Sequence, residues 1–229
     1  MRRLIDFTVG AFALVLLFPL IALLALIVLC CLGRPILFRQ TRAGRWGADF
    51  FILKFRTMRA PSYFGEPDDA RLNTAGRVLR GTSLDELPQL VNVLRGEMAL
   101  VGPRPTLPEQ IDYYDARQRG RLSVRPGVTG WAQIHGRNSR SWPERIELDL
   151  WYVEHRSVLL DLRIILRTAV ALLRPRGVVA GPDANPFRPD APTQPIRGIP
   201  PVSTQRENLR PESSATEECD VPATDKNLI

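Results

Sequence analysis

An uncharged run near the N-terminus restricts this chain more than any other feature. Phe7 to Leu32 spans 26 residues and contains no charged side chain. As an α-helix it would measure roughly 39 Å, which exceeds the roughly 30 Å hydrocarbon core of a bilayer. A secretory signal has an apolar stretch of only about 7–15 residues, followed by small residues at a cleavage site. We therefore predict that residues 1–33 form a membrane helix that stays on the mature protein.

The charges on both sides of this run bear on its topology. Arg2 and Arg3 precede it, and four more arginines follow within residues 34–45. Cationic flanks tend to stay cytoplasmic, and a single span cannot satisfy both flanks. A re-entrant segment broken at Pro19 can, because proline removes a backbone donor and clashes with the preceding turn. A spanning helix with a tolerated proline kink is the alternative, and charge and proline alone favour the re-entrant form only slightly.

Composition excludes several other classes of protein. Three cysteines and two histidines are too few for a disulfide framework or a histidine-rich metal centre. Neither common glycine-rich nucleotide loop occurs, so phosphate must be bound by side chains or by another backbone arrangement. Arginine supplies nearly all the positive charge and suits bidentate phosphate contacts, although a GC-rich genome explains the same bias. The net charge of +7 alone is weak support for nucleic-acid binding, which we do not expect.

The chain divides into three parts by composition. After the membrane segment, residues 34–186 carry the remaining sequence motifs and most of the positive charge. Residues 187–229 contain five basic residues, seven acidic residues and seven prolines, with few large apolar side chains. We predict a cytoplasmic domain over 34–186 and a disordered Pro-rich tail over 187–229.

Apolar spacing predicts a helix-rich α/β domain. Two short strands around a glycine turn predict an antiparallel hairpin, at residues 36–38 and 50–55 with the turn at 44–47. Four helices are expected, over 84–95, 106–120, 144–154 and 157–173. The last helix is densely apolar but carries one arginine stripe, formed by Arg163, Arg167 and Arg174. Such a helix fits the membrane interface, and a core helix with a salt-bridged edge fits the pattern equally well.

The most specific polar cluster lies in residues 80–89. Ser83 and Glu86 match a capping box, in which the acids Asp85 and Glu86 only decorate the first turn of a helix. Pro88 conflicts with that interpretation, because it would fall beyond the donors that a helix start leaves free. The helix must then kink or begin later. In the other interpretation, the adjacent acids are a nucleophile and a metal ligand.

Two further clusters are candidates for phosphate contacts. A strand that carries Lys54 and Arg56 places both cations on one face, although basic residues beside a membrane segment usually meet anionic headgroups. Arg104 stands between Pro103 and Pro105, which restrict its backbone and would hold it in place for an oxyanion. An ordinary turn is the alternative there.

Two weaker candidates follow. Trp131 lies in the polar run 127–138 and could stack on a base or sugar, although most such tryptophans serve packing. Asp149 follows Arg145 by four helical residues, a spacing that usually gives a solvated ion pair.

Six short motifs stand in the order expected of one family. They are Lys54-Phe-Arg-Thr-Met58, Ser83-Leu-Asp-Glu-Leu-Pro-Gln89, Gly102-Pro-Arg-Pro105, Pro126-Gly-Val-Thr-Gly-Trp-Ala-Gln133, Gly136-Arg-Asn138 and Glu147-Leu-Asp-Leu150. On these motifs the chain resembles the bacterial sugar transferases, which are monotopic polyprenyl-phosphate phosphoglycosyl transferases. The resemblance covers about residues 2–180. Each motif is modest, but six in order are specific.

The resemblance implies the fold, the reaction and the location. It implies a small catalytic domain with a short hairpin, interfacial amphipathic helices and a re-entrant helix on the bacterial inner membrane, facing the cytoplasm. The implied reaction transfers a sugar 1-phosphate from a UDP-sugar to undecaprenyl phosphate and releases UMP. That reaction is the first membrane step of exopolysaccharide, capsule, O-antigen (lipopolysaccharide) or glycoprotein glycan assembly. The chain corresponds to the minimal, single-domain form of the family.

The resemblance also implies roles for individual residues. Asp85 becomes the covalent nucleophile, and Glu86 becomes the Mg²⁺ ligand. We assign Lys54, Arg80 and Arg104 to phosphate contacts, and the weaker candidate Asp149 to the polar part of the site. The chain departs from the family pattern at Phe18, where serine is common before the proline, and at His135, where asparagine is frequent.

One rival function comes from another class of protein. A non-catalytic adaptor could use the same basic face to bind anionic lipid at the membrane surface. An adaptor does not need a nucleophilic Asp85, which separates the two hypotheses. The sequence leaves the donor sugar, the glycan and the oligomeric state open, a homodimer included.

Overall fold

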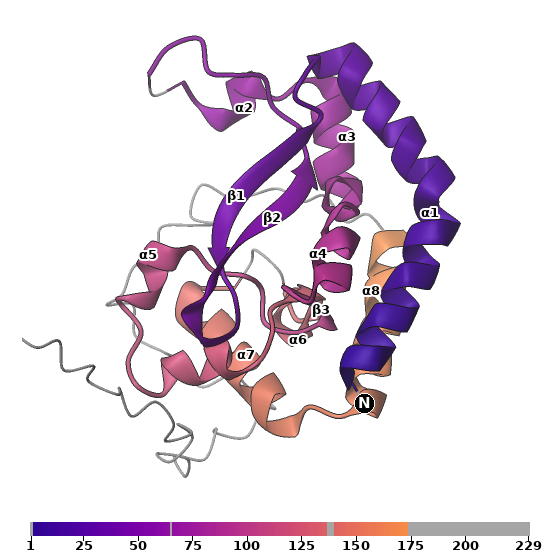
Figure 1. Ribbon diagram of the computed structural model, residues 1–229. Coiled ribbons are helices and arrows are strands. Elements are labelled where there is room, and N and C mark those ends of the chain that lie inside the picture. Colours follow the sequence, from indigo (N-terminus) through magenta and orange to yellow (C-terminus); the bar gives the residue numbers. More distant parts are fainter. Residues whose placement is uncertain (1, 65, 137–139, 174–229) are drawn as a thin grey trace, which may run out of the picture.

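The computed structural model describes residues 2–64, 66–136 and 140–173 (Figure 1). Within this part, the protein is helix-rich and contains an antiparallel pair and a parallel pair of strands. The predicted fold class is therefore confirmed. The predicted disordered tail at 187–229 and Arg174 lie outside the described residues.

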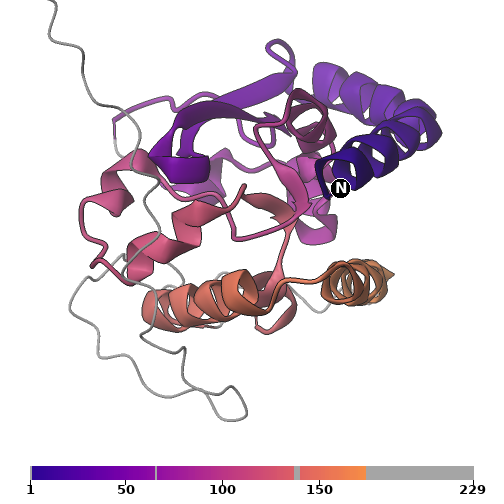
Figure 2. The same ribbon diagram turned by 60° about the horizontal axis from the view of Figure 1, so that its bottom comes forward.

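The uncharged run forms most of one long helix, α1 (Arg2–Leu32), which continues through Pro19. Figure 2 shows that α1 bends along its length. Its mean hydropathy reaches 3.2 over 18 residues, of which only 11% are buried, so it is long and apolar enough to cross a membrane. The helix is therefore not interrupted at Pro19, where a break was predicted. The re-entrant topology stays a prediction.

A narrow contact stripe joins α1 to the rest of the protein. A Cβ atom on Gly10 would lie 3.2 Å from Cγ1 of Val93, so glycine lets α1 approach helix α4 (Gln89–Arg95) closely. Farther along α1, Leu24 and Val28 are buried. They form one apolar cluster with Phe55 and Leu79.

The predicted hairpin is confirmed and is longer than expected. Strands β1 (Leu37–Ala43) and β2 (Asp49–Phe55) are antiparallel, joined through the 3₁₀ turn η1 (Arg45–Gly47). The buried Asn92 side chain satisfies the other edge of β2. It accepts a hydrogen bond from the Leu53 amide at 3.1 Å and donates to the Phe51 carbonyl at 2.8 Å. These bonds fix the hairpin against α4.

The predicted helix over 84–95 begins later than expected. Helices α2 (Asp68–Arg71) and α3 (Thr74–Thr82) come first, and α3 ends at Ser83, whose φ is +58°. A short 3₁₀ turn, η2 (Leu84–Glu86), then leads to α4. Pro88 occupies the N-cap of α4, where the absence of an N–H donor costs nothing.

The predicted continuous helix over 106–120 is wrong. The segment contains one helical turn, α5 (Pro108–Ile111), and it leads into η3 (Gln118–Ser123). Between them, Asp115 and Gln118 each use a side-chain oxygen to accept the other's backbone N–H. Such local side-chain bonds compete with the helical ladder and explain its interruption.

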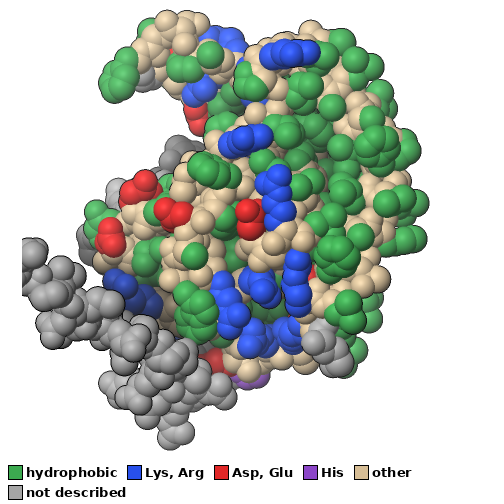
Figure 3. Space-filling view, in the orientation of Figure 1, with side chains coloured by type: hydrophobic (Ala, Val, Ile, Leu, Met, Phe, Trp, Pro, Cys, Tyr) green, Lys and Arg blue, Asp and Glu red, His purple; other side chains and the backbone are tan. Residues whose placement is uncertain are grey.

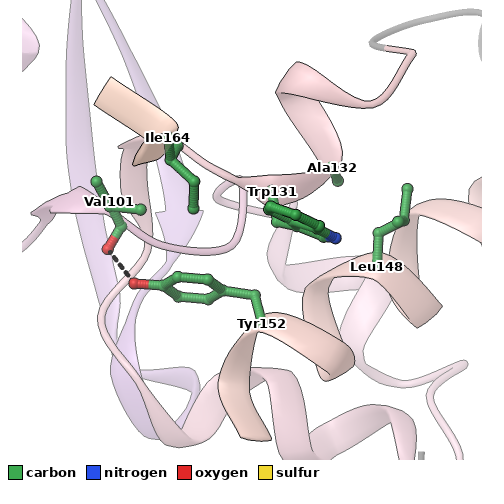
Figure 4. Packing of buried hydrophobic residues seen from close by; sticks show 6 residues of the cluster. All are labelled: Val101, Trp131, Ala132, Leu148, Tyr152 and Ile164. Carbon is green, nitrogen blue, oxygen red and sulfur yellow. Dashed lines mark hydrogen bonds between the residues drawn. The ribbon is translucent and has the colours of Figure 1, made fainter. Parts of the chain in front are cut away.

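The second half of the chain builds the other main core. Strands β3 (Ala99–Val101) and β4 (Gly127–Thr129) are parallel, and a short helix, α6 (Trp131–Ile134), follows. Helices α7 (Trp142–His155) and α8 (Val158–Leu173) confirm the two predicted C-terminal helices. Figure 4 shows their apolar side chains around Trp131. Trp131 is 8% exposed and stacks on Trp151 at 4.5 Å, so it serves packing.

The outer surface separates apolar from cationic side chains. In Figure 3, hydrophobic side chains gather along the edge formed by α1, while Lys and Arg side chains form a band down the middle of the same face. Helix α8 lies on the same side of the molecule as α1 (Figures 1 and 2). Ile164 of α8 is fully buried, whereas five other apolar side chains are exposed: Val158, Leu159, Leu162, Leu166 and Val170. Helix α8 therefore combines a core face with an uncovered apolar face.

Candidate active site

The acid pair of η2 does not form the capping box that the sequence pattern permits. Ser83 lies in the left-handed region and makes no side-chain bond to the turn. Glu86 reaches two cations from other elements instead. Its Oε1 accepts hydrogen bonds from Nζ of Lys54 at 2.6 Å and from Nη2 of Arg104 at 3.3 Å. The capping interpretation is therefore wrong, and the acids belong to a cluster assembled from three parts of the chain.

The two neighbouring carboxylates have opposite electrostatic environments. Burial acts to raise the pKa of Glu86, but the charges of Arg104 and Lys54 outweigh it and hold that pKa below its usual range. Burial, together with the adjacent charge of Glu86, raises the pKa of Asp85 to about 6. At neutral pH both groups are mainly ionised. Asp85 is the more basic of the two, which suits a nucleophile.

Lys54 is held in the site by the hairpin. It lies near the end of β2, opposite Phe38, in the strand that Asn92 fixes to α4. Its predicted partner cation, Arg56, has another task. Arg56 donates hydrogen bonds to the carbonyls of Gly33 at 2.8 Å and Arg34 at 3.0 Å, just beyond α1. Of these two cations, the structure therefore brings Lys54 to the acids and leaves Arg56 at the end of α1.

Arg80 approaches from the end of α3. Its Nε donates to Oγ1 of Thr57 at 2.9 Å, and its charge acts on Asp85 to lower that pKa. Gly76 makes this approach possible, because a Cβ atom there would lie 2.0 Å from the Thr57 carbonyl oxygen. Any larger residue at position 76 would push α3 and its arginine away.

Arg104 stands in a loop whose backbone is held tightly. The Gly102 N–H donates to the Thr129 carbonyl, and the Gly127 N–H donates to the Pro103 carbonyl, both at 2.9 Å. A Cβ atom on Gly127 would lie 2.1 Å from the Gly102 nitrogen, so the loop and β4 are in direct backbone contact. The side chain of Arg104 is half exposed, which leaves it accessible to an anion.

A fourth cation adds to the positive charge. Burial, and then the charge of Arg104, lower the pKa of Arg42 on β1. Arg42 donates to Oε1 of Gln40 at 2.8 Å. Together with Lys54, Arg80 and Arg104, Arg42 makes four cations whose charges act on Asp85 or Glu86. The excess positive charge suits a ligand with several phosphate oxygens.

Asp149 lies apart from this cluster. It is 1% exposed, so the predicted solvated pair with Arg145 is wrong. Its Oδ2 instead accepts a hydrogen bond at 2.5 Å from Nη2 of the buried Arg121, which comes from η3. Burial raises the pKa of Asp149 to about 6, although Arg121 opposes this shift. Asp149 therefore faces the interior behind the loop that carries Arg104.

The order of the motifs and this geometry agree with the comparisons. The model of the family described as "Bacterial sugar transferase" matches residues 1–175. The chain belongs to the bacterial sugar transferase family. "Uncharacterized sugar transferase EpsL" of Bacillus subtilis is 43% identical over 181 residues, which cover 78% of this chain and 90% of that relative.

Several relatives of this sugar transferase carry a fuller name. They are called "UDP-glucose:undecaprenyl-phosphate glucose-1-phosphate transferase". The protein of Caulobacter vibrioides is 43% identical over 187 residues, covering 75% of this chain and 69% of its own. The protein of Escherichia coli K12 is 36% identical over 181 residues, covering 73% of this chain and 39% of its own.

Sequence reasoning missed three residues in or behind the candidate site. Thr57 positions Arg80. It belongs to the motif Lys54-Phe-Arg-Thr-Met58, but no role was assigned to the threonine itself. Arg42 was grouped with cations that meet headgroups. Arg121 had no signal, because its partners lie far away in the sequence. The motif 136–138 extends beyond the described residues. Among described residues, no group of three or more His, Cys, Asp or Glu side chains could hold a metal.

Proposed function

We propose that this sugar transferase moves a sugar 1-phosphate from a UDP-sugar to undecaprenyl phosphate and releases UMP. The observation that carries the proposal is the pair Asp85–Glu86 beside Lys54, Arg80 and Arg104. The names of the relatives support the class of donor and of acceptor. The product would start an exopolysaccharide or a related glycan, and two relatives are named exopolysaccharide production proteins.

The reaction would proceed in two displacements. An oxygen of Asp85 attacks the β-phosphorus of the UDP-sugar, and the bond to the α-phosphate oxygen breaks, so UMP leaves. An oxygen of undecaprenyl phosphate then attacks the same phosphorus. The acyl phosphate bond breaks, lipid-diphosphate-sugar forms, and the Asp85 carboxylate is restored. Splitting the transfer lets a soluble donor and a lipid acceptor use one site in turn.

The surrounding cations answer the main electrostatic difficulty of this chemistry. A carboxylate that attacks a diphosphate meets a group of like charge. Lys54, Arg80 and Arg104 lower this repulsion, and their fixed positions stabilise the charge on the equatorial oxygens and on departing UMP. Because Lys54 and Arg104 both bind Glu86, the pKa of Glu86 stays low and the carboxylate stays ionised.

The donor groups also fit a magnesium ion. Mg²⁺ is commonly held by one or two carboxylates together with substrate phosphates, so the acid pair does not require a third acid. Glu86 is the proposed ligand, because both hydrogen bonds from cations reach Oε1 and leave Oε2 for the metal. The ion would neutralise charge on the diphosphate.

The attachment of α1 supports a re-entrant membrane helix. At its start, Nη2 of Arg3 donates to the Leu94 carbonyl at 2.6 Å, and Oδ1 of Asp6 accepts from the Leu100 amide at 3.1 Å. At its end, Arg56 binds the carbonyls beyond Leu32. Both ends therefore lie on one folded domain, which suits two flanks on one side of the inner membrane, the cytoplasmic side.

A trapping experiment tests this function. The purified protein is given a panel of UDP-sugars labelled in the β-phosphate, with Mg²⁺ and without lipid acceptor. The wild type should keep label on the protein and release UMP in a stoichiometric burst, whereas Asp85→Asn should do neither. Asp69→Asn, on the exposed helix α2, is the control and should behave as the wild type. Normal turnover of Asp85→Asn with undecaprenyl phosphate would refute the covalent route. No UMP release with any donor would favour the lipid-binding adaptor.

A further inference from the structure

Behind the proposed site lies a closed ion pair to which the mechanism gives no task. The side chains of Arg121 and Asp149 are 4% and 2% exposed, and they join η3 to α7. Arg121 also donates through Nη2 to the Arg104 carbonyl at 3.0 Å. One guanidinium therefore connects a buried carboxylate to the backbone of the arginine that binds Glu86.

A second connection reaches the other side of the same loop. Nη1 of Arg121 donates to the Tyr114 hydroxyl at 2.6 Å, and that hydroxyl donates to Oγ1 of Thr106 at 3.0 Å. The Thr106 carbonyl accepts a hydrogen bond from the Ala43 amide at 3.0 Å. Arg121 thus contacts residue 104 directly and residue 106 through one tyrosine. The two prolines fix their own φ angles, and Pro105 restricts Arg104 to extended conformations, but neither proline determines where the loop lies relative to η3 and α7.

Stability alone explains such a pair poorly. Removing two charges from water is costly, and a pair of well-packed apolar residues often replaces a buried ion pair without loss of stability. Unlike an apolar side chain, a guanidinium supplies several hydrogen-bond donors in a fixed plane. Here the donors reach Asp149, Tyr114 and the Arg104 carbonyl at once. The pair therefore adds contacts at Arg104 and behind Thr106 to the backbone bonds that hold the loop at Gly102 and Pro103.

We propose that Arg121, oriented by Asp149, is a positioning residue that sets Arg104 for its contact with Glu86 and with the substrate diphosphate. The proposal rests on the proposed function for the identity of that substrate. Neither Arg121 nor Asp149 touches the substrate in this account. Both act through Arg104.

The first test replaces the buried pair by apolar residues. The double variant Arg121→Met/Asp149→Leu should remain folded, because no charge is left unpaired. We expect kcat/KM for UMP release to fall at least thirtyfold. The matched control is Arg117→Met/Glu147→Leu, which removes an ion pair between the start of η3 and α7 that does not reach Arg104. This control should stay within threefold of wild type. Equal losses in both double variants would overturn the proposal.

A double-mutant cycle separates positioning from a general structural effect. In an Arg104→Ala background, the apolar pair should lower kcat/KM by less than threefold, because its target side chain is already absent. Independent structural damage would instead give the full loss again. Should the apolar pair fail to fold, Arg121→Lys serves in its place. Lysine keeps the charge but not the planar fork, so it should lower kcat/KM at least fivefold in the wild-type background and less than twofold with Arg104→Ala.

Hydrogen exchange supplies a readout that does not depend on turnover. In the apolar pair variant, amides of the peptide 100–107 should exchange at least tenfold faster than in wild type, while peptides from β2 and α3 stay unchanged. Unchanged exchange over 100–107 would overturn the positioning role even in an active enzyme. Absence of UMP release from the wild type would count against the proposed function, and the exchange result would still decide the positioning.

Discussion

Two acid–cation clusters in this molecule use the same chemistry and differ in what surrounds them. Glu86 shares one oxygen between Lys54 and Arg104, and these side chains keep access to solvent. Asp149 binds the single guanidinium of Arg121 in a closed interior. The open cluster has more cations than acids, so it can take a further anion, whereas the closed cluster is already balanced. An excess of charge and access to solvent therefore distinguish the candidate site from the scaffold behind it.

The largest expected effect breaks the open cluster. Glu86→Gln keeps the size of the side chain but removes its charge, so we expect activity to fall about a thousandfold or more, roughly 4 kcal/mol of barrier. Stability should change little, because Lys54 and Arg104 can turn to solvent. UMP release and thermal unfolding of the same preparation measure both quantities. Normal activity in this variant would mean that the acid pair is only structural.

In the closed cluster, substitution should change stability strongly. Asp149→Ala leaves Arg121 buried without its partner, which should cost about 3–5 kcal/mol of unfolding free energy. Glu147→Ala is the control on the same helix, and its partner Arg117 is more exposed. Loss of that pair should cost only about 0–1 kcal/mol. Denaturant unfolding of the detergent-solubilised variants compares them, and similar costs would show that burial does not separate the two pairs.

The pH dependence of the first displacement sharpens the comparison within the open cluster. Burial and the charge of Glu86 raise the pKa of Asp85 to about 6, and only the ionised form can attack. The burst rate of UMP should therefore fall as pH drops through that pKa, about tenfold between pH 7 and pH 5, or roughly 1.4 kcal/mol.

A variant at Lys54 tests whether Asp85 is the group that titrates. The charge of Lys54 lowers the pKa of Asp85, so Lys54→Gln should move the midpoint of the profile to higher pH. A midpoint that stays in place would assign the titration to another group.

The sequence predicted the local parts of this arrangement better than the long-range parts. The hairpin and the helices α7 and α8 follow from apolar spacing, and Pro88 signalled that the helix after η2 begins late. Asp149 shows the limit. The spacing to Arg145 suggested a solvated neighbour on the same helix, yet the partner is Arg121 on η3. No local pattern announces such a contact, because the fold alone brings the two segments together.

The acid pair could be assigned to a site only through the resemblance to the family. Ser83 and Glu86 satisfy the capping pattern in sequence, but Ser83 has a left-handed backbone and Glu86 binds Lys54 and Arg104 instead. Local chemistry therefore favoured a helix start, and contacts with β2 and the Arg104 loop prevailed. Lys54 and Arg56 teach the same lesson. Both were candidates by pattern, but Lys54 binds Glu86 whereas Arg56 binds the backbone just beyond α1.

The smallest expected effects come from a pair of arginines on one helix. Arg80 and Arg77 are both exposed side chains of α3, but Arg80 bonds to Thr57 and acts on Asp85. Arg80→Gln should lower kcat/KM about tenfold, roughly 1.4 kcal/mol, because one fixed cation near the diphosphate is lost. Arg77→Gln should change it by no more than about twofold, roughly 0.4 kcal/mol.

Steady-state UMP release at two salt concentrations separates these arginines further. Salt weakens the attraction between the substrate and a cation in direct contact with it less than the attraction to a more distant surface cation. The loss in Arg80→Gln should therefore persist at high salt, and the small loss in Arg77→Gln should vanish. Equal losses at low salt, both removed by high salt, would show that the whole basic band of Figure 3 attracts the donor and that position within the cluster counts for little.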